Sequence, residues 1–212
     1  MTAKKNPIGP GEEGWQAHKS QSTKQQILDA AVHCIIELGY ANTTAMKISE
    51  KANLSRGATL HHFKTKSDII AATVDYLYEK RERAFRNTGR ELPSNADRVT
   101  VATRSYWEHA NHPLFVAFFE LSVAARHDEQ LRKILLPAQK KFDEEWYAMA
   151  LEIFPEWQGD ASAFKFALEL TQTMMEGIAI SHLMHPRSDN NESLLQFLED
   201  QIRQLLPAPV EK

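Results

Sequence analysis

The side chains of this sequence that are best suited to chemistry are cations gathered in one short segment. Five of them fall within twenty residues, at Lys47, Lys51, Arg56, Lys64 and Lys66. A cluster of lysine and arginine can neutralise a polyanion. A solvated basic face is the alternative, and it is the commoner meaning of a charge bias taken alone.

The charge of the chain differs between its two parts. The 212 residues carry a net charge of −3, yet residues 18–66 carry +4, from seven Lys and Arg against three acids. Residues 67–212 carry −7, from 16 Lys and Arg against 23 acids. This division predicts a polyanion partner for the first part and none for the second.

The other reactive residue types give weaker patterns. His61 and His62 are neighbours, and adjacent positions on a helix point about 100° apart, which makes a poor chelate. His109 and His112 form a loose metal or acid–base pattern, for which polar lining is the favoured interpretation. The sequence has no nucleophile elbow, phosphate loop, dinucleotide fingerprint or HExxH motif. We therefore expect no catalytic residue, no metal and no cofactor, and a small all-α enzyme stays a remote alternative.

Helical patterns follow one another along the chain. Capping residues predict a first helix from Ser22 or Thr23 to Gly39, short helices after Thr44 and Ser55, and a fourth helix from Thr65. Further helices are expected near 95–110, 113–126, 128–154, 160–184 and 191–206. No hairpin or alternating strand pattern occurs, so the prediction is an all-α fold of about nine helices.

Domain boundaries follow from the same pass. Residues 1–20 are polar and hold Pro7 and Pro10, which predicts a flexible arm, although Trp15 is expected to pack on the body. Residues 21–66 are expected to form one domain and residues 67–212 a second. Cys34 excludes an internal disulfide, because it is the only cysteine, and its apolar surroundings predict that it packs in a helix core.

The segment from Ala45 to His62 has the residues that two short helices joined by a tight turn require. Ser49 and Ala52 are small enough for a close helix crossing. Asn53 suits the positive φ of the turn, and Leu54 can enter the core. The basic residues on either side favour a helix-turn-helix unit over an interior helical hairpin.

The stretch from Thr23 to Ala72 resembles the DNA-binding domain of the TetR family of transcriptional regulators. The segments LSRGA, HHF and KTK carry the resemblance most closely. Two departures stand out. Asn53 replaces the family's usual turn glycine, and Thr59-Leu60 stands where the family often has Leu-Tyr, whose tyrosine touches a phosphate. The hydroxyl of Thr59 or the imidazole of His61 can take over that contact.

The resemblance implies a double-stranded DNA operator as partner. Arg56 is then the base reader, able to bond a guanine through two hydrogen bonds, and Gly57 permits close approach. The residues that start the recognition helix are expected in the major groove, and those of the flanking helix ends on phosphates. The full set of expected DNA contacts is Thr44, Lys47, Ser55, Arg56, Gly57, Ala58, Thr59, His61, Lys64, Thr65 and Lys66.

The acidic part is expected to assemble the molecule. An apolar stripe on the last helix could be a buried core, but the resemblance favours a homodimer interface. The residues of this stripe are Leu194, Leu195, Leu198, Ile202 and Leu205.

The acidic part is also expected to regulate the molecule. Large apolar residues could line an effector pocket, although each one alone is more typical of ordinary core. They are Tyr106, Trp107, Phe115, Phe118, Phe119, Trp146, Met174 and Met175. A small apolar or aromatic effector bound among them would tilt the fourth helix, which we expect to be the one rigid element that reaches both domains.

These expectations describe a ligand-responsive regulator, with a repressor favoured over an activator or an effector-independent regulator. No apolar run reaches the roughly 18 residues of a membrane span, and the N-terminal residues have no apolar segment typical of a secretory signal. The cytoplasm is therefore the expected location.

Overall fold

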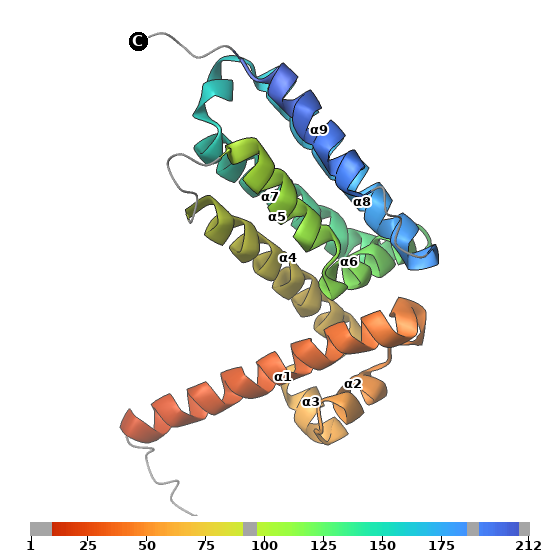
Figure 1. Ribbon diagram of the computed structural model, residues 1–212. Helices are drawn as coiled ribbons and strands as arrows, with labels where there is room; N and C mark the ends of the chain where they lie inside the picture. The colour runs from red at the N-terminus through yellow and green to blue at the C-terminus, as the bar shows by residue number, and fades with distance from the viewer. Residues whose placement is uncertain (1–9, 91–96, 186–190, 208–212) are drawn as a thin grey trace, which may run out of the picture.

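The computed structural model describes residues 10–90, 97–185 and 191–207, and the regular structure in these ranges is entirely helical (Figure 1). This confirms the all-α prediction of about nine helices. The elements are α1 (Pro10–Asn42), α2 (Ala45–Lys51), α3 (Arg56–His62), α4 (Lys66–Arg90), α5 (Arg98–Ala110), α6 (Pro113–Ala124), α7 (Glu129–Ile153), the 3-10 helix η1 (Pro155–Gly159), α8 (Ala161–Met184) and α9 (Asn191–Leu205).

The helices form two bodies joined by α4. Helices α1–α3 and the start of α4 make a small N-terminal body, and the rest of α4 runs into a bundle with α5–α9 (Figure 1). Helices α8 and α9 lie side by side along one flank of that C-terminal bundle. None of the helices in the described ranges is long and apolar enough to cross a membrane.

The first helix is longer than the sequence pattern indicated. It begins at Pro10, so residues 10–20 of the expected arm are helical, and residues 1–9 lie outside the described part of the chain. Proline is favoured at a first helical position, and the Glu, Gln, Ala and Lys that follow are good helix formers. Thr23 does not cap a helix, since its hydroxyl donates to the Lys19 carbonyl at 3.0 Å. Trp15 does not pack on the body and is 64% exposed.

The three capping motifs predicted in the N-terminal body are confirmed. Thr44 Oγ1 accepts a hydrogen bond from the Lys47 N–H at 3.2 Å, and Ser55 Oγ accepts one from the Ala58 N–H at 3.1 Å. Thr65 and Asp68 cap α4 reciprocally, at 2.9 and 3.1 Å. These bonds satisfy N–H groups that have no partner within the helix, and so they fix where each helix starts.

The turn between α2 and α3 has the expected geometry. Asn53 has a φ of +51°, and it is the only non-glycine residue with positive φ in the described ranges. Ala52 and Ser49 are buried at the crossing. There the Ser49 hydroxyl donates to Thr59 Oγ1 at 2.9 Å. The helix-turn-helix unit is therefore held by a left-handed turn and one buried hydroxyl pair.

Two hydrophobic cores share the helices that enter both bodies. The small core surrounds Ile27, Ile48 and Ile69, and Cys34 is buried in it, where burial raises the pKa of its thiol. The large core fills the bundle and also takes Val32 from α1 and Val74 from α4. The first turns of α4 thus belong to the small core, beyond the boundary expected at residue 66.

A second junction links the bodies beside α4. Helix α6 packs along α1, and the Tyr40 N–H donates to Glu120 Oε2 at 3.4 Å. The Tyr40 hydroxyl donates to Asp128 Oδ2 at 2.8 Å. Burial, aided by that carboxylate, raises the pKa of Tyr40 to about 12, so the hydroxyl keeps its proton. The expectation that α4 alone touches both domains is therefore wrong, because α6 and the start of α7 also do so.

Helix α9 is fixed to α5 by a buried carboxylate. Glu199 accepts hydrogen bonds from Thr100 Oγ1 at 2.9 Å and from Arg104 Nε at 3.2 Å, and Arg203 lies 3.4 Å away. A buried carboxylate without these donors would be costly, so the network sets the rotation of α9 about its axis.

The turn conformation gives a first prediction. Asn53→Val should lower the free energy of unfolding by about 1–2 kcal/mol, because a β-branched residue is strained at positive φ. Asn53→Gly should stay within about 0.5 kcal/mol of the unmodified protein, since glycine adopts this φ freely. Chemical denaturation measures both variants. Equal stability of the valine and glycine variants would contradict the assignment of a left-handed turn.

Candidate functional site

The exposed face of α3 and the residues at its two ends carry about half of the side chains expected to meet a polyanion. Arg56, Gly57 and His61 are exposed on α3, and Lys64 is exposed just beyond it. Ser55 and Thr44 are exposed at the N-terminal ends of α3 and α2, and Ala58 is half-buried. Two helix N-termini and three basic side chains therefore face solvent on one small body.

Gly57 has no structural reason within the chain. A Cβ added there would meet only Ser55 Oγ, at 3.9 Å, which is ordinary van der Waals contact. Glycine inside a helix costs about 1 kcal/mol relative to alanine. Because none of the described residues crowds this position, the space beside Gly57 is open to another molecule.

Thr59 does not lie where the sequence placed it. It is 2% exposed, and its hydroxyl belongs to the buried crossing with Ser49. Position 59 follows Ser55 by four residues, and this spacing turns its side chain inward toward α2. The expectation that Thr59 contacts a partner is wrong in this structure.

Three further residues are engaged within the N-terminal body. Lys66 Nζ lies 4.3 Å from the centre of the Tyr40 ring and 3.4 Å from the Tyr40 carbonyl oxygen, and burial lowers the pKa of its amine. Lys47 Nζ donates to the Asn42 carbonyl at 3.0 Å. The Thr65 N–H is bonded to Asp68. Each would have to exchange an internal contact for a phosphate.

Sequence reasoning missed two exposed apolar residues of the N-terminal body. Met46 is 62% exposed on α2 and Leu60 is 42% exposed on α3. Leu60 occupies the position at which the family often has its tyrosine. Exposed apolar side chains beside a basic face suit the methyl groups of thymine. For Leu60, the available signal was the departure from the family's Leu-Tyr pair at Thr59-Leu60. This leucine does not belong to the small core.

The eight residues expected to line one pocket are divided by the structure. Tyr106 and Trp146 line a cavity of about 50 Å³ between α5, α7, α8, α9 and η1, which we call the inner cavity. Phe118 lines a separate cavity of about 310 Å³ between α4, α5 and α6, which we call the Arg81 cavity. The remaining five line neither of these cavities: Phe115 and Met175 are buried core, Trp107 packs on His182, and Phe119 and Met174 are half-buried.

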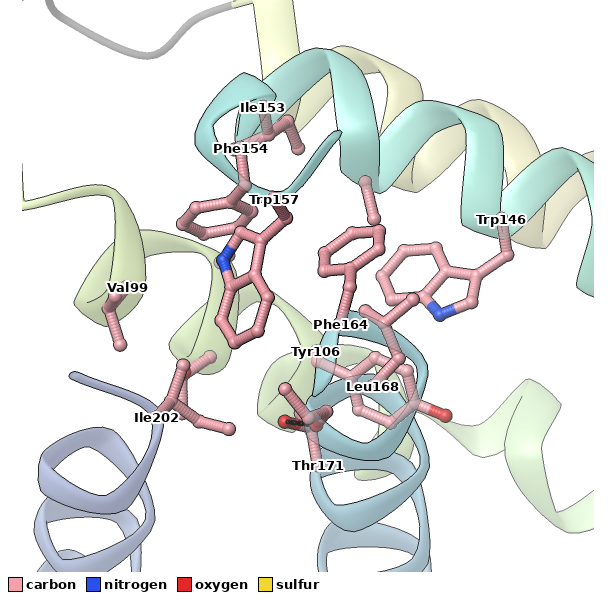
Figure 2. A pocket seen from close by; sticks show the side chains of 14 residues that line it. Val99, Tyr106, Trp146, Ile153, Phe154, Trp157, Phe164, Leu168, Thr171 and Ile202 are labelled. Atoms are coloured by element: carbon pink, nitrogen blue, oxygen red, sulfur yellow. Dashed lines mark hydrogen bonds between the residues drawn. The ribbon is translucent and has the colours of Figure 1, made fainter. Parts of the chain in front are cut away.

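The inner cavity is apolar but small. Figure 2 shows the Trp157 and Phe164 side chains projecting into the same space, with Ile202 of α9 beyond them. The ring centroids of Trp157 and Phe164 are 5.5 Å apart. Pockets for small-molecule ligands usually measure about 300–1,000 Å³. In this conformation the inner cavity can hold little more than water.

The Arg81 cavity is larger and more polar than the sequence indicated. Its walls come from the middle of α4, the second half of α5 and the start of α6. The residues that line it are Leu77, Tyr78, Lys80, Arg81, Ala84, Ser105, Glu108, His109, His112, Leu114 and Phe118. The expectation of a lining with few charges is therefore wrong for this cavity.

His109 is a neutral group in the wall of the Arg81 cavity. Its ring lies 4.9 Å from that of Phe85. Burial, followed by the nearby charges of Arg81 and His112, lowers the pKa of His109 to about 3. His112 instead caps α6, where its Nδ1 accepts a hydrogen bond from the Leu114 N–H at 3.2 Å. The described residues contain no cluster of ligands that could hold a metal.

The stripe assigned to dimer contacts mostly faces the subunit core. Leu195, Leu198 and Ile202 are buried, with Leu198 only 1% exposed, and Leu205 is half-buried. They were misassigned because α9 must cover α5 and α8 before it can offer a face to a second copy. Leu194 is partly exposed, and the most exposed large apolar residue of α9 is Phe197, at 57%.

Comparison with known proteins agrees with this geometry. Residues 27–73 match the sequence model of the family described as "Bacterial regulatory proteins, tetR family". The uncharacterized HTH-type transcriptional regulator Mb2936c of Mycobacterium bovis is 28% identical over 188 residues, which span 86% of this chain and 94% of that relative. These similarities cover the helix-turn-helix unit and most of the remainder.

Solved structures share the fold. A putative transcriptional regulator from Pseudomonas aeruginosa PAO1 superposes with a TM-score of 0.68 at 18% identity, over 87% of this chain and 90% of that one. The multidrug binding protein EbrR, complexed with ethidium, gives a TM-score of 0.62 at 19% identity, over 88% and 99%. Residues 27–73 therefore belong to the TetR family of bacterial regulatory proteins, and the relative that spans most of the chain is named as an HTH-type transcriptional regulator.

The burial of His109 gives a second prediction. Below about pH 6.5 the unfolded chain binds a proton at this imidazole, whereas the folded protein does not bind it until about pH 3. The free energy of unfolding should therefore fall as pH drops, by about 2 kcal/mol from this group between pH 6.5 and 5. His109→Gln should remove that part of the loss, as measured by denaturation at both pH values. An unchanged pH dependence would contradict a neutral His109.

Proposed function

We propose that this regulator is a homodimeric repressor that binds a near-palindromic DNA operator and leaves it when a small-molecule effector binds. The exposed start of α3, with Arg56 beside the open space at Gly57, is the observation that carries the proposal. An activator, or a regulator without an effector, would use the same DNA-binding surface. A DNA-binding role also implies that the protein acts in the bacterial cytoplasm.

The N-terminal body supplies base contacts and phosphate contacts from different residues. Arg56 is exposed at the first position of α3, which is where a recognition helix enters the major groove. His61, Lys64 and the N-terminal end of α2 at Thr44 suit phosphates. Lys66 and Lys47 stabilise the body through Tyr40 and Asn42, and we assign them a smaller share of the affinity for DNA.

The division between bases and phosphates gives a third prediction. After selection of bound fragments from the source genome, Arg56→Ala should cost about 1–3 kcal/mol at the selected site and relax the base preference at one position in each half-site. Lys64→Ala should weaken binding to all DNA alike and lower the salt slope by about one. Arg83→Gln, at an exposed arginine on α4, is the control. Full affinity and preference in Arg56→Ala would rule out the base-reading role.

The flank formed by α8 and α9 is the proposed dimer surface. Its exposed apolar side chains include Phe166 and Met184 on α8 and Phe197 on α9. Between them, a Cβ at Gly177 would meet nothing within 4 Å, so the middle of α8 leaves room for another helix to approach closely. A patch of this kind on a surface usually marks an interface. A twofold axis here would set two recognition helices about one DNA turn apart, or a multiple of it.

The proposed dimer gives a fourth prediction. Phe197→Glu should yield a folded monomer, because the side chain projects away from the core. Leu136→Glu on α7 is a matched control, since Leu136 is 55% exposed and lies on a helix outside this flank. It should leave the dimer intact. Light scattering at micromolar concentration measures the mass, and an unmodified chain that is monomeric there would exclude the dimer.

The effector is proposed to act through the two junctions between the bodies. A ligand that contacts α4 and α6 touches two elements of the bundle that pack on α1. It weakens DNA binding only to the extent that it prefers the conformation that does not bind DNA, which is typically about 1–3 kcal/mol. The complex of EbrR with ethidium shows that a protein of this fold can hold a small molecule, which supports a ligand response here.

A further inference from the structure

We propose that the Arg81 cavity is the effector site and that its ligand is a compact, largely apolar or aromatic molecule bearing an anionic group, such as a carboxylate, which Arg81 binds. This inference rests on the proposed ligand response and adds the place and the chemistry. It also adds an anionic group to the small apolar or aromatic effector expected from the sequence.

Arg81 is a buried cation with unused hydrogen-bonding capacity. Its side chain is 5% exposed, and Nη2 donates to the Tyr106 hydroxyl at 2.8 Å and to Glu176 Oε1 at 3.0 Å. Its Nε and Nη1 are buried with no partner among the described residues. A guanidinium has five N–H donors, so three of them lack an acceptor from this part of the chain. Buried donors are normally paired, and an exception of this size needs an explanation.

A purely structural ion pair does not explain this arrangement. Glu176 meets one nitrogen only, and the other carboxyl nearby, Asp143, accepts its hydrogen bond from Gln139. Burial raises the pKa of Asp143, which makes it a poorer counter-ion. The guanidinium also lies 4.4 Å from the centre of the Phe142 ring, where an apolar side chain would pack without unmet donors. An acceptor from outside the chain accounts for the choice of arginine.

The rest of the cavity describes the ligand body. Leu77, Leu114 and Phe118 offer apolar walls, and the volume of about 310 Å³ lies at the lower end of the range for ligand pockets. Lys80 adds a second cation to the lining, and its Nζ lies 3.5 Å from Asp29 Oδ1. Glu108 is an exposed acid in the same lining. His109 stays neutral and does not repel a cation or attract an anion. A single aromatic or fused-ring acid suits this volume.

The location couples the ligand to the DNA-binding body. Arg81 and Leu77 are on α4, which starts among the residues beside the recognition helix, and Phe118 is on α6, two residues before Glu120. Glu120 bonds the Tyr40 N–H at the end of α1. A molecule drawn toward Arg81 is therefore held between two of the helices that contact the N-terminal body.

The test compares acids with uncharged copies of the same shape. The probes are 4-ethylbenzoate with 4-ethylbenzamide, and 2-naphthoate with 2-naphthamide, titrated by calorimetry into the full chain at pH 7 without DNA. At least one acid should bind more tightly than its amide by about tenfold or more, because a charge-assisted hydrogen bond replaces a neutral one. Arg81→Gln should abolish that preference, and Arg83→Gln should keep it.

A second variant guards against misfolding of Arg81→Gln, which leaves Glu176 without its cation. Ala84 is exposed on α4 in the lining of the cavity, so Ala84→Trp fills the space without disturbing the core. It should exclude acid and amide alike and leave the thermal midpoint of the free protein nearly unchanged. Binding of an acid to Ala84→Trp with unchanged affinity would overturn the site.

The outcomes separate this inference from the proposed function. Equal affinities for acid and amide, a preference that survives in Arg81→Gln, or no acid binding at millimolar concentration would each overturn the anion site. A ligand that lowers operator affinity without depending on Arg81 would leave the regulator intact and remove this site. Acids that bind through Arg81 and never change operator affinity would leave the site intact and overturn the ligand response.

Discussion

The two bodies of this molecule are held in register because α1 and α4 take part in both hydrophobic cores. Ile27 and Ile69 fill the small core, while Val32 and Val74, about one turn further along the same helices, fill the large one. A close-packed interior transmits displacement because it has no space in which to absorb it. The recognition helix therefore cannot change its angle to the bundle unless α1 or α4 shifts against α6 and α7. Tyr40, which bonds both Glu120 and Asp128, lies at that point of contact.

The helix-turn-helix unit could be predicted at its turn, its crossing and its helix starts because the constraints there are local. A positive φ favours Asn or Gly, a close helix crossing favours Ser or Ala, and a helix start favours a hydroxyl or a carboxylate. The residue types of Asn53, Ser49 and Thr65 are therefore enough to predict their structural roles. The inward orientation of Thr59 and the internal contacts of Lys66 were not predicted, for a different reason. Their orientation depends on Ser49 and Tyr40, which are neighbours in space at sequence separations of 10 and 26.

The C-terminal bundle was predictable as helices but not as surfaces. An apolar stripe such as that of α9 fits a core and an interface equally well, and only the tertiary contacts of Leu198 decide between them. The proposed effector site could not be located from the sequence either. Aromatic residues indicated the core of the bundle. The residue that distinguishes the Arg81 cavity is instead a charged one, on the helix that was expected only to transmit the effect of a ligand to the N-terminal body. A buried cation is rare enough to carry information, but its burial cannot be seen until the helices are assembled.

Because Glu199 anchors α9 to α5, different residues of this short helix serve folding and surface recognition. The buried carboxylate and its donors on α5 fix the helix from inside, together with Leu195, Leu198 and Ile202. The outward side chains, Leu194 and Phe197, therefore add little to the fold of their own subunit. Substitutions on that outer row alter what the surface recognises without a large penalty in folding stability, whereas those on the inner row are constrained by packing. If this face forms the proposed dimer, such a helix can change the partner that its subunit accepts over many generations while the fold of the subunit stays the same.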